Sequence, residues 1–319
     1  MGRARLHAAP SVPALGTIEL TRSPPRVEIR ISENLHSWQI SAAPNVTMSS
    51  VPYLLGVNVV PERIPQEDAY PFNLPFVGDL CLEFHTPVTF FLGENGTGKS
   101  TLIEAIASLC RLPVSGGGRN ELSSGHGPDS KSALATVLRL AFRRRPSDAY
   151  FLRAEFQAHF ASLLDARRDD PDFRLDPYTR YGGRSLHTRS HGEAFLSILE
   201  HRVERGLFLL DEPESALSPQ RQLVLLAHMW NLVSKGTSQF IIATHSPILL
   251  TFPGADLIAF DEGTLERVKL EDTSHYQITR GILQSSESYW KHLRLASDPE
   301  PVGPSVPRPR AHRRKKPEP

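Results

Sequence analysis

An eight-residue stretch of the sequence has the glycine and lysine spacing that binds phosphate groups. Residues 93–100 fit the pattern G-x-x-x-x-G-K-[ST], whose glycines let backbone N–H groups curl around phosphates. We expect the Lys99 ammonium to reach the β- and γ-phosphates and the Ser100 hydroxyl to bind Mg²⁺. The expected phosphate-contacting residues are Gly93, Glu94, Asn95, Gly96, Thr97, Gly98, Lys99, Ser100 and Thr101.

Two carboxylates and a histidine follow apolar runs further along the chain. Asp211 and Glu212 come directly after Leu207–Leu210, and His245 follows Gln239–Ala243. The ends of buried strands are where α/β sheets hold their ligands. Asp211 is expected to hold Mg²⁺, mostly through water, and Glu212 to orient or deprotonate an attacking water. His245 could sense a γ-phosphate; the alternative is a structural histidine with satisfied hydrogen bonds.

The elements that must position these residues alternate between strands and helices. The apolar patterns predict strands at Leu54–Val60, Val88–Leu92, Gly206–Leu210 and Gln239–Ala243, and a hairpin formed by Asp256–Phe260 and Leu265–Leu270. Helical spacing predicts a helix over Ser100–Cys110. A second helix begins after Ser218, ends at Gly236 and places Leu223, Leu226, Trp230 and Val233 on one face. We therefore expect an α/β fold with a mixed sheet flanked by helices.

The chain divides into one folded body and two extensions. Residues 1–47 and 298–319 are rich in proline and lack periodicity, so we expect both to be disordered, the second being basic. The body then spans residues 48–297. Within it, residues 111–190 interrupt the alternation, and we interpret them as a mainly helical insertion with a Gly/Ser loop. This insertion includes a basic stretch, at Arg139, Arg143, Arg144 and Arg145, and the segment Tyr150–Phe160.

Composition excludes several classes of protein. The formal net charge is +1, so polyanion binding by bulk charge is excluded and any nucleic-acid contact needs a local patch. The two cysteines, Cys81 and Cys110, cannot build a disulfide framework. No apolar run approaches the roughly 20 residues that span a bilayer. We therefore expect a cytoplasmic protein that does not insert into membranes.

The order of these three elements resembles the head of an ABC-type ATPase. Residues 93–100 correspond to its Walker A motif, Leu207–Glu212 to Walker B with the catalytic glutamate, and His245 to the switch histidine. Residues 215–218 resemble the D-loop. Residues 190–193, Ser-His-Gly-Glu, are similar to the signature motif. The resemblance is to compact stand-alone bacterial predicted ATPases, labelled AAA family ATPases, which are P-loop NTPases similar to ABC and SMC heads without coiled-coil arms.

This resemblance implies an activity and an assembly. It implies Mg²⁺-dependent hydrolysis of ATP to ADP and phosphate, with Lys99, Glu212 and His245 as catalytic residues and with Ser100 and Asp211 as metal ligands. It also implies a head-to-tail homodimer with ATP at the interface, where Ser190, Gly192 and Glu193 contact the γ-phosphate held by the other protomer. Ser190 and Glu193 also fit an ordinary helix cap, and both interpretations can hold at once.

Other assignments stay open at this level. Gln157 is the nearest candidate for the Q-loop glutamine of the family, and Tyr70 or Phe72 for the aromatic residue that stacks on adenine. The arginines at 139–145 are either a solvated helix face or a nucleic-acid contact. The alternative function is a nucleotide-gated switch, or the motor subunit of a DNA-repair, defence or transport partner, with little turnover of its own.

Overall fold

The computed structural model describes residues 51–65, 67–119, 132–155, 157–169, 176–181, 183, 185–188, 190–261 and 263–297. The expected extensions at 1–47 and 298–319 lie outside the described residues. The described part contains a seven-stranded sheet, a small three-stranded sheet and six α-helices, joined by short 3₁₀ helices. None of the described helices is long and apolar enough to cross a membrane.

The large sheet has the strand order β10–β9–β3–β8–β7–β6–β4. Its strands are β3 (Val88–Leu92), β4 (Gly117–Gly118), β6 (Ala149–Arg153), β7 (Gly206–Asp211), β8 (Ser238–Ala243), β9 (Asp256–Ala259) and β10 (Glu266–Val268). The five strands from β9 to β6 are parallel, while β10 and β4 pair antiparallel at the two edges. The predicted strands at 88–92, 206–210 and 239–243 and the predicted hairpin are confirmed.

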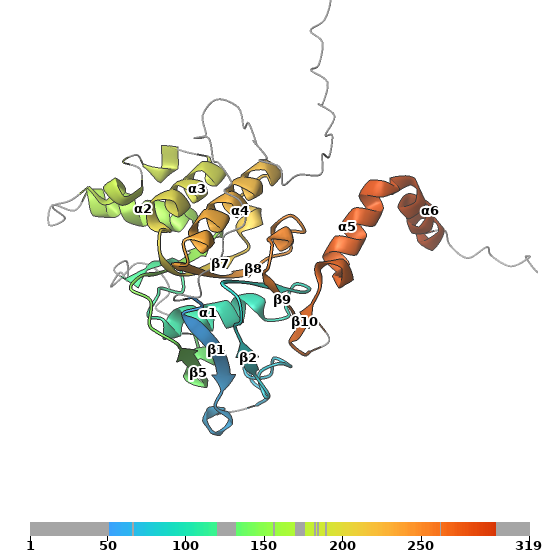
Figure 1. Ribbon diagram of the computed structural model, residues 1–319, viewed down its shortest axis with the longest axis horizontal. Coiled ribbons are helices and arrows are strands. Elements are labelled where there is room, and N and C mark those ends of the chain that lie inside the picture. The colour runs from blue at the N-terminus through green and yellow to red at the C-terminus, as the bar shows by residue number, and fades with distance from the viewer. Residues whose placement is uncertain are drawn as a thin grey trace, which may run out of the picture.

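Helices cover both faces of this sheet (Figure 1). One face carries α1 (Lys99–Leu109), and the other carries α2 (Gln157–Arg168), α3 (His191–Arg202) and α4 (Pro219–Ser234). Alternate residues of the strands point to opposite sides, so Phe90 packs in one core and Phe91 in the other. Burial on both faces explains why the central strands have unbroken apolar runs.

The predicted face of α4 is partly wrong. Its buried side runs through Leu225, Met229 and Leu232, whereas Leu223 is 41% exposed. The other three residues of the predicted face, Leu226, Trp230 and Val233, are only partly buried against the core. Because α4 packs against both β8 and α3, its covered surface is broader than one helical stripe, and it is rotated from the predicted one.

The small sheet packs beside α1 and has the order β2–β1–β5, with all pairs antiparallel. Its strands are β1 (Leu54–Val59), β2 (Cys81–Glu83) and β5 (Leu138–Phe142). The strand predicted at 54–60 is confirmed. The helix expected around Arg139 is wrong, because this residue lies in β5 and pairs with Asn58. The segment alternates apolar and polar residues, which is the period of a strand.

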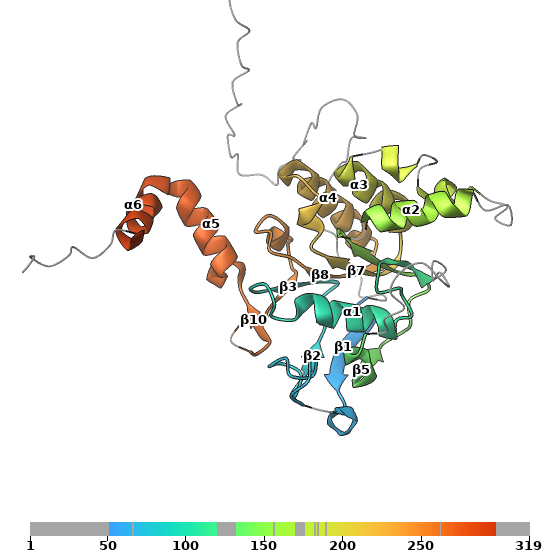
Figure 2. The same ribbon diagram turned by 180° about the vertical axis from the view of Figure 1, so that it is seen from behind.

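Among the described residues of 111–190, those after Arg153 are mainly helical, and those before it are not. Tyr150 and its neighbours, expected in the insertion, form β6, which lies parallel to β7 and between β7 and the edge strand β4 of the large sheet. Helix α2 and two 3₁₀ turns, η4 (Pro177–Tyr181) and η5 (Leu186–Thr188), follow it. The chain ends its described part in α5 (Ser274–Gln284) and α6 (Ser286–Ser297), which extend away from the body (Figures 1 and 2).

One buried side chain connects the two sheets. Gln239 of β8 is fully buried; its amide nitrogen donates to the Leu54 carbonyl and its oxygen accepts from the Leu54 N–H, both at 2.9 Å. We expect Gln239→Leu to lower the free energy of unfolding by about 2–4 kcal/mol, because buried backbone groups that lose their partners cost about 1–3 kcal/mol each. Urea unfolding measures this loss.

The matched control is Gln284→Leu, which changes an exposed glutamine at the end of α5. This variant should stay within about 0.5 kcal/mol of the wild type. Equal stability of the two variants would show that Gln239 does not connect the sheets energetically.

Candidate functional site

Three loops meet at the carboxyl edge of the large sheet. They follow β3, β8 and β7, which are neighbours in that order. Backbone hydrogen bonds join the ends of these strands: the Thr244 N–H donates to the Phe91 carbonyl and the Glu212 N–H donates to the Ala243 carbonyl, both at 3.0 Å. The residues predicted at 93–100, 211–212 and 245 are therefore brought together.

The glycine-rich loop after β3 closes around the lysine side chain. Lys99 is only 4% exposed, and its ammonium donates to the carbonyls of Gly93 and Glu94, each at 2.8 Å. Burial lowers the pKa of Lys99, while the carboxylates of Glu212 and Asp211 oppose this shift. Gly98 has a φ of +95°, and a Cβ there would lie 2.7 Å from the Phe76 ring, so this position requires glycine.

The two expected metal ligands are already in contact. The Ser100 hydroxyl donates to Asp211 Oδ1 at 2.8 Å, and this bond joins the first turn of α1 to the end of β7. Burial raises the pKa of Asp211 to about 6, against the opposing effect of the Arg153 guanidinium. A hydroxyl and a carboxylate are hard oxygen ligands that suit Mg²⁺.

Mg²⁺ is usually held by one or two carboxylates together with phosphate oxygens and water, rather than by a protein cage. Ser100 and Asp211 are therefore a suitable protein contribution to such a site.

Arg153, at the end of β6, is a neighbour of this pair that the sequence patterns did not reveal. Its guanidinium lies 3.2 Å from Asp211 Oδ2 and donates to Glu104 of α1 at 2.5 Å. The side chain is only 12% exposed. The positive charge of Arg153, on the strand beside β7, compensates the negative charge of the buried Asp211 carboxylate. No sequence motif marks it, because its partners lie about 50 residues away on either side.

Glu212 and His245 face each other across the edge of the sheet. Glu212 Oε1 lies 3.7 Å from His245 Nε2. Glu212 adopts a left-handed backbone with φ +47°, which is uncommon for a residue other than glycine and is often found at functional sites. Burial lowers the pKa of His245, and the Lys99 ammonium lowers it further. A neutral imidazole is therefore favoured here.

A cavity of about 180 Å³ opens beside these groups, lined by Tyr70, Asn95, Gly96, Gly98, Lys99, Ser100, Thr101 and Glu212. Of the two aromatic candidates, Tyr70 lies at this cavity. Its ring is exposed, and its hydroxyl is 2.9 Å from Thr101 Oγ1. Phe72 is partly buried against the core beneath α1. Tyr70 is thus the better placed of the two for stacking on a base.

Glu214 fixes the loop that carries His245. Its carboxylate accepts from the His245 N–H at 2.5 Å and from the Thr244 hydroxyl at 2.8 Å. Burial raises the pKa of Glu214. Glu214 lies in the short helix η6 (Pro213–Ser215) directly after Glu212. This contact therefore joins the loops after β7 and β8, and the sequence motifs did not identify it.

Ser190, Gly192 and Glu193 lie outside the cavity, at the start of α3. The Glu193 N–H donates to Ser190 Oγ at 3.4 Å and the Ser190 N–H donates to Glu193 Oε2 at 3.1 Å, which confirms the predicted helix cap. Arg221 of α4 donates to both side chains. A Cβ on Gly192 would lie 2.9 Å from the Ala216 carbonyl, so α3 approaches the loop after Glu212 closely.

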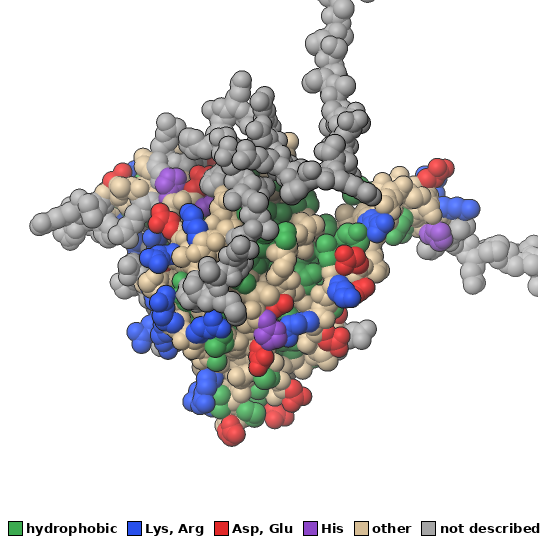
Figure 3. All heavy atoms as spheres, viewed as in Figure 1, with side chains coloured by type: hydrophobic (Ala, Val, Ile, Leu, Met, Phe, Trp, Pro, Cys, Tyr) green, Lys and Arg blue, Asp and Glu red, His purple; other side chains and the backbone are tan. Residues whose placement is uncertain are grey.

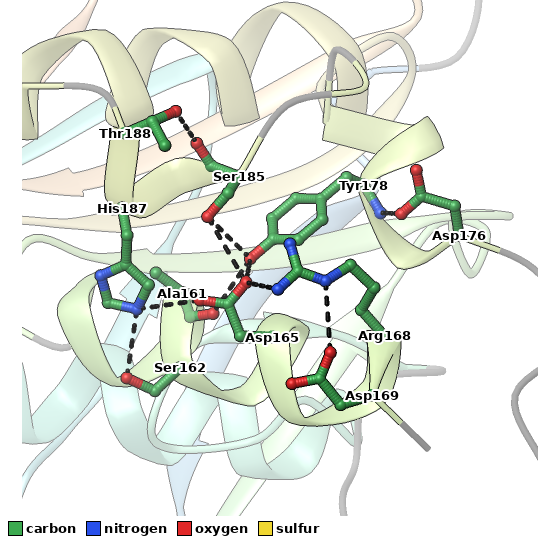
Figure 4. A network of polar contacts seen from close by, with 10 residues as sticks. All are labelled: Ala161, Ser162, Asp165, Arg168, Asp169, Asp176, Tyr178, Ser185, His187 and Thr188. Carbon is green, nitrogen blue, oxygen red and sulfur yellow. Dashed lines mark hydrogen bonds and ion pairs between the residues drawn. The ribbon is translucent and has the colours of Figure 1, made fainter. Parts of the chain in front are cut away.

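A polar network holds the chain segment before Ser190 (Figure 4). Asp165 of α2 accepts from the Tyr178 hydroxyl at 2.5 Å and from the Ser185 hydroxyl at 3.4 Å, and it lies 3.5 Å from the His187 ring. Burial raises the pKa of Tyr178 to about 12, so the phenol stays protonated and donates. The network positions the turns that lead into α3. Gln157 is the first residue of α2, and its side chain lies outside the described residues.

Two family models of AAA domains match the two parts of the chain that carry this site. Residues 73–157, which contain the glycine-rich loop, match a model described as AAA domain. Residues 193–251, which contain Asp211, Glu212 and His245, match one described as "AAA domain, putative AbiEii toxin, Type IV TA system". Both matches are to models of AAA domains, and each covers less than half of the chain. The fold and the matches together support nucleotide binding and hydrolysis in general.

Solved structures give distant likenesses. A putative metal-chelate type ABC transporter is 15% identical with a TM-score of 0.44, covering 71% of this chain and 88% of that one. A part of the cbiONQ ABC transporter complex from Clostridium perfringens is 16% identical with a TM-score of 0.40, covering 76% and 99%. The SMC head domain from Thermotoga maritima is 14% identical with a TM-score of 0.36, covering 68% and 98%. Such likenesses assign no function. The search of curated proteins gave no match.

We expect Glu214→Ala to lower the kcat of nucleotide hydrolysis by about tenfold or more, because the His245 backbone loses its anchor and small misplacements of catalytic groups are costly. Glu214→Gln should stay within about threefold of the wild type. Its amide oxygen can accept from His245, and its nitrogen can donate to the Thr244 hydroxyl. A steady-state phosphate-release assay measures both variants. Wild-type turnover of a folded Glu214→Ala protein would contradict this anchoring role.

Proposed function

We propose that this protein is an Mg²⁺-dependent ATPase that hydrolyses ATP to ADP and phosphate and couples the reaction to the opening and closing of a homodimer. The observation that carries the proposal is the convergence at one sheet edge. The glycine-rich loop binds the Lys99 ammonium and leads into Ser100, whose hydroxyl donates a hydrogen bond to Asp211. Glu212 and His245 lie beside this group. These groups supply phosphate binding, a metal site and a base at one edge of the sheet, where Lys99, Ser100 and Glu212 line the cavity.

Each residue of the site would have its own role in the hydrolysis of ATP. The backbone N–H groups of the loop and the Lys99 ammonium bind the β- and γ-phosphates and stabilise charge on the transferred group. Ser100 and Asp211 hold Mg²⁺, which would neutralise charge on the phosphate oxygens when bound. The Glu212 carboxylate orients the attacking water and accepts its proton. His245, neutral and facing Glu212, donates a hydrogen bond to the γ-phosphate.

The position of the signature-like residues supports the dimer. Ser190 and Glu193 are exposed and do not line the cavity of their own chain. If they contact a γ-phosphate, it must be one held by a second copy. ATP between two copies would then favour the closed dimer, and hydrolysis would remove the contacts that hold it closed. Arg221, which donates to both residues, would fix their orientation.

We expect Glu212→Gln to reduce phosphate release by about 100-fold or more, since loss of a general base typically costs 10²–10⁴-fold. The variant should still bind ATP, because the amide leaves the glycine-rich loop intact. With ATP and Mg²⁺ it should accumulate as a dimer, which light scattering after gel filtration measures. The wild type should return to monomer as ATP is consumed.

Lys99→Ala is the companion variant and should weaken binding of a fluorescent ATP analogue, because it removes the buried ammonium from the loop. A wild type that binds ATP without turnover would contradict the ATPase proposal and favour a nucleotide-gated switch. Equal dimerisation of wild type and Glu212→Gln at all times would contradict the coupling to dimer closure.

A second candidate function is action on nucleic acid, which one observation favours. Arg139, Arg143, Arg144 and Arg145 are all exposed on and after β5, the edge strand of the small sheet. Figure 3 shows Lys and Arg side chains gathered on one flank of the body. The guanidinium groups of Arg144 and Arg145 lie over Tyr53 and Phe142. Clustered arginines of this kind are suited to phosphate contacts along a nucleic-acid backbone.

If this candidate is right, double-stranded DNA should stimulate phosphate release, and the stimulation should fall steeply between about 50 and 200 mM salt. The double variant Arg139→Glu/Arg143→Glu should lose the stimulation and keep its basal turnover. The control is Lys291→Glu on α6, which also replaces a positive side chain by a negative one. It should be stimulated by DNA as the wild type is. Absence of stimulation at low salt would exclude this candidate.

A further inference from the structure

His275, near the start of α5, contacts the histidine of the candidate site. His275 Nε2 lies 3.3 Å from His245 Nδ1, and the two rings are tilted with their centroids 5.5 Å apart. The sequence patterns gave no role to His275, which lies 30 residues beyond His245. It arrives at the site from an element outside the three loops that carry the motifs.

The start of α5 is held firmly enough to fix this contact. Thr273, the N-cap, is 4% exposed; its hydroxyl accepts from the Tyr276 N–H at 3.2 Å and donates to the Leu270 carbonyl at 2.8 Å. Leu270 begins the 3₁₀ turn η8 (Leu270–Asp272) that follows β10. The turn and the cap therefore set where His275 lies relative to the edge of the sheet.

Both imidazoles are favoured in their neutral forms. Burial is the main cause that lowers the pKa of His275, with opposing effects from the carboxylates of Glu94 and Asp261. Burial also lowers the pKa of His245, as does the Lys99 ammonium. Two neutral imidazoles that share one hydrogen bond must divide the roles, so one nitrogen donates and the other accepts.

The surroundings decide which ring donates. His275 Nδ1 is buried and has no hydrogen-bond partner among the described residues. His245 Nε2 is also buried and has no hydrogen-bond partner among the described residues, so either arrangement leaves one N–H without a partner. On His245 Nε2 that N–H faces the Glu212 carboxylate, and the attraction to this negative charge favours the proton there. His275 therefore donates through Nε2. His245 Nδ1 then accepts, and the proton of His245 resides on Nε2, which faces Glu212 Oε1 at 3.7 Å.

We propose that His275 is a positioning residue that fixes the tautomer and orientation of His245, so that His245 Nε2 presents a proton to the γ-phosphate. The proposal deepens the proposed ATPase function and rests on it. Because His275 is the second residue of α5, the contact also connects the nucleotide site to the helices α5 and α6, which extend from the body (Figure 2). A partner that displaces α5 would remove the donor and slow hydrolysis.

Two substitutions separate hydrogen bonding from packing. His275→Leu keeps a side chain of similar bulk but removes the hydrogen-bond donor. We expect its kcat to fall about tenfold and its KM to change less than about twofold. A loss of this size is in the range that supporting hydrogen-bond partners cause. His275→Gln places an amide nitrogen near the position of Nε2, and it should keep kcat within about threefold. The control His292→Leu changes an exposed histidine of α6 and should be unaffected. Equal losses in the Leu and Gln variants would overturn the proposal.

A second readout does not require turnover. In full-length protein labelled with ¹⁵N-histidine and free of nucleotide, NMR reports which nitrogen of His245 carries the proton, and the signal is assigned by its loss in His245→Asn. We expect the Nε2–H tautomer in the wild type and in His275→Gln, and a mixture in His275→Leu. An Nδ1–H tautomer in the wild type, or an unchanged tautomer in His275→Leu, would overturn the proposal. An inactive wild type with the expected tautomers would contradict the ATPase function alone.

Discussion

The parallel order of β3, β8 and β7 is the constraint on which the rest of the structure depends. Parallel neighbours end at the same edge, so three loops from distant parts of the sequence are delivered to one place. The apolar side chains on both faces of these strands hold the order, with α1 on one side and α3 and α4 on the other. The polar side chains of the candidate site can then lie on short loops at the edge of a rigid sheet.

Polar contacts between the loops refine this arrangement. Ser100 joins the first turn of α1 to Asp211, Glu214 joins the loops after β7 and β8, and His275 adds a contact from α5. Each contact joins two different elements, so a shift of any one loop would change the positions of the others. Arg153 balances the buried carboxylate, and without it the desolvated Asp211 would lack a compensating charge.

The sequence predicted the parts of the site that are local in the chain. Unbroken apolar runs marked β3, β7 and β8, and the residues that follow them were the correct ones to place at one edge. The interpretation failed where the pattern was weaker. The alternation in β5 was taken for a basic helix, and β6 was assigned to a helical insertion although Tyr150–Leu152 is as apolar as the other parallel strands.

Contacts between distant residues could not be predicted in the same way. Arg153, Glu214 and His275 belong to no motif, and their partners are 30 to 58 residues away in the sequence. Only the folded arrangement shows that they meet the residues of the candidate site. The covered face of α4 was similarly misjudged, since packing against β8 and α3 together decides which residues are buried.

The most direct test of the central claim is a crystal structure of Glu212→Gln with ATP and Mg²⁺. We expect the triphosphate in the glycine-rich loop, Mg²⁺ at Ser100 and Asp211, and His245 Nε2 at the γ-phosphate, with Ser190 of a second copy on its other side. Nucleotide bound elsewhere, or bound in the loop with His245 and Asp211 both out of reach of the phosphates and the metal, would contradict the claim that these loops form one hydrolytic site.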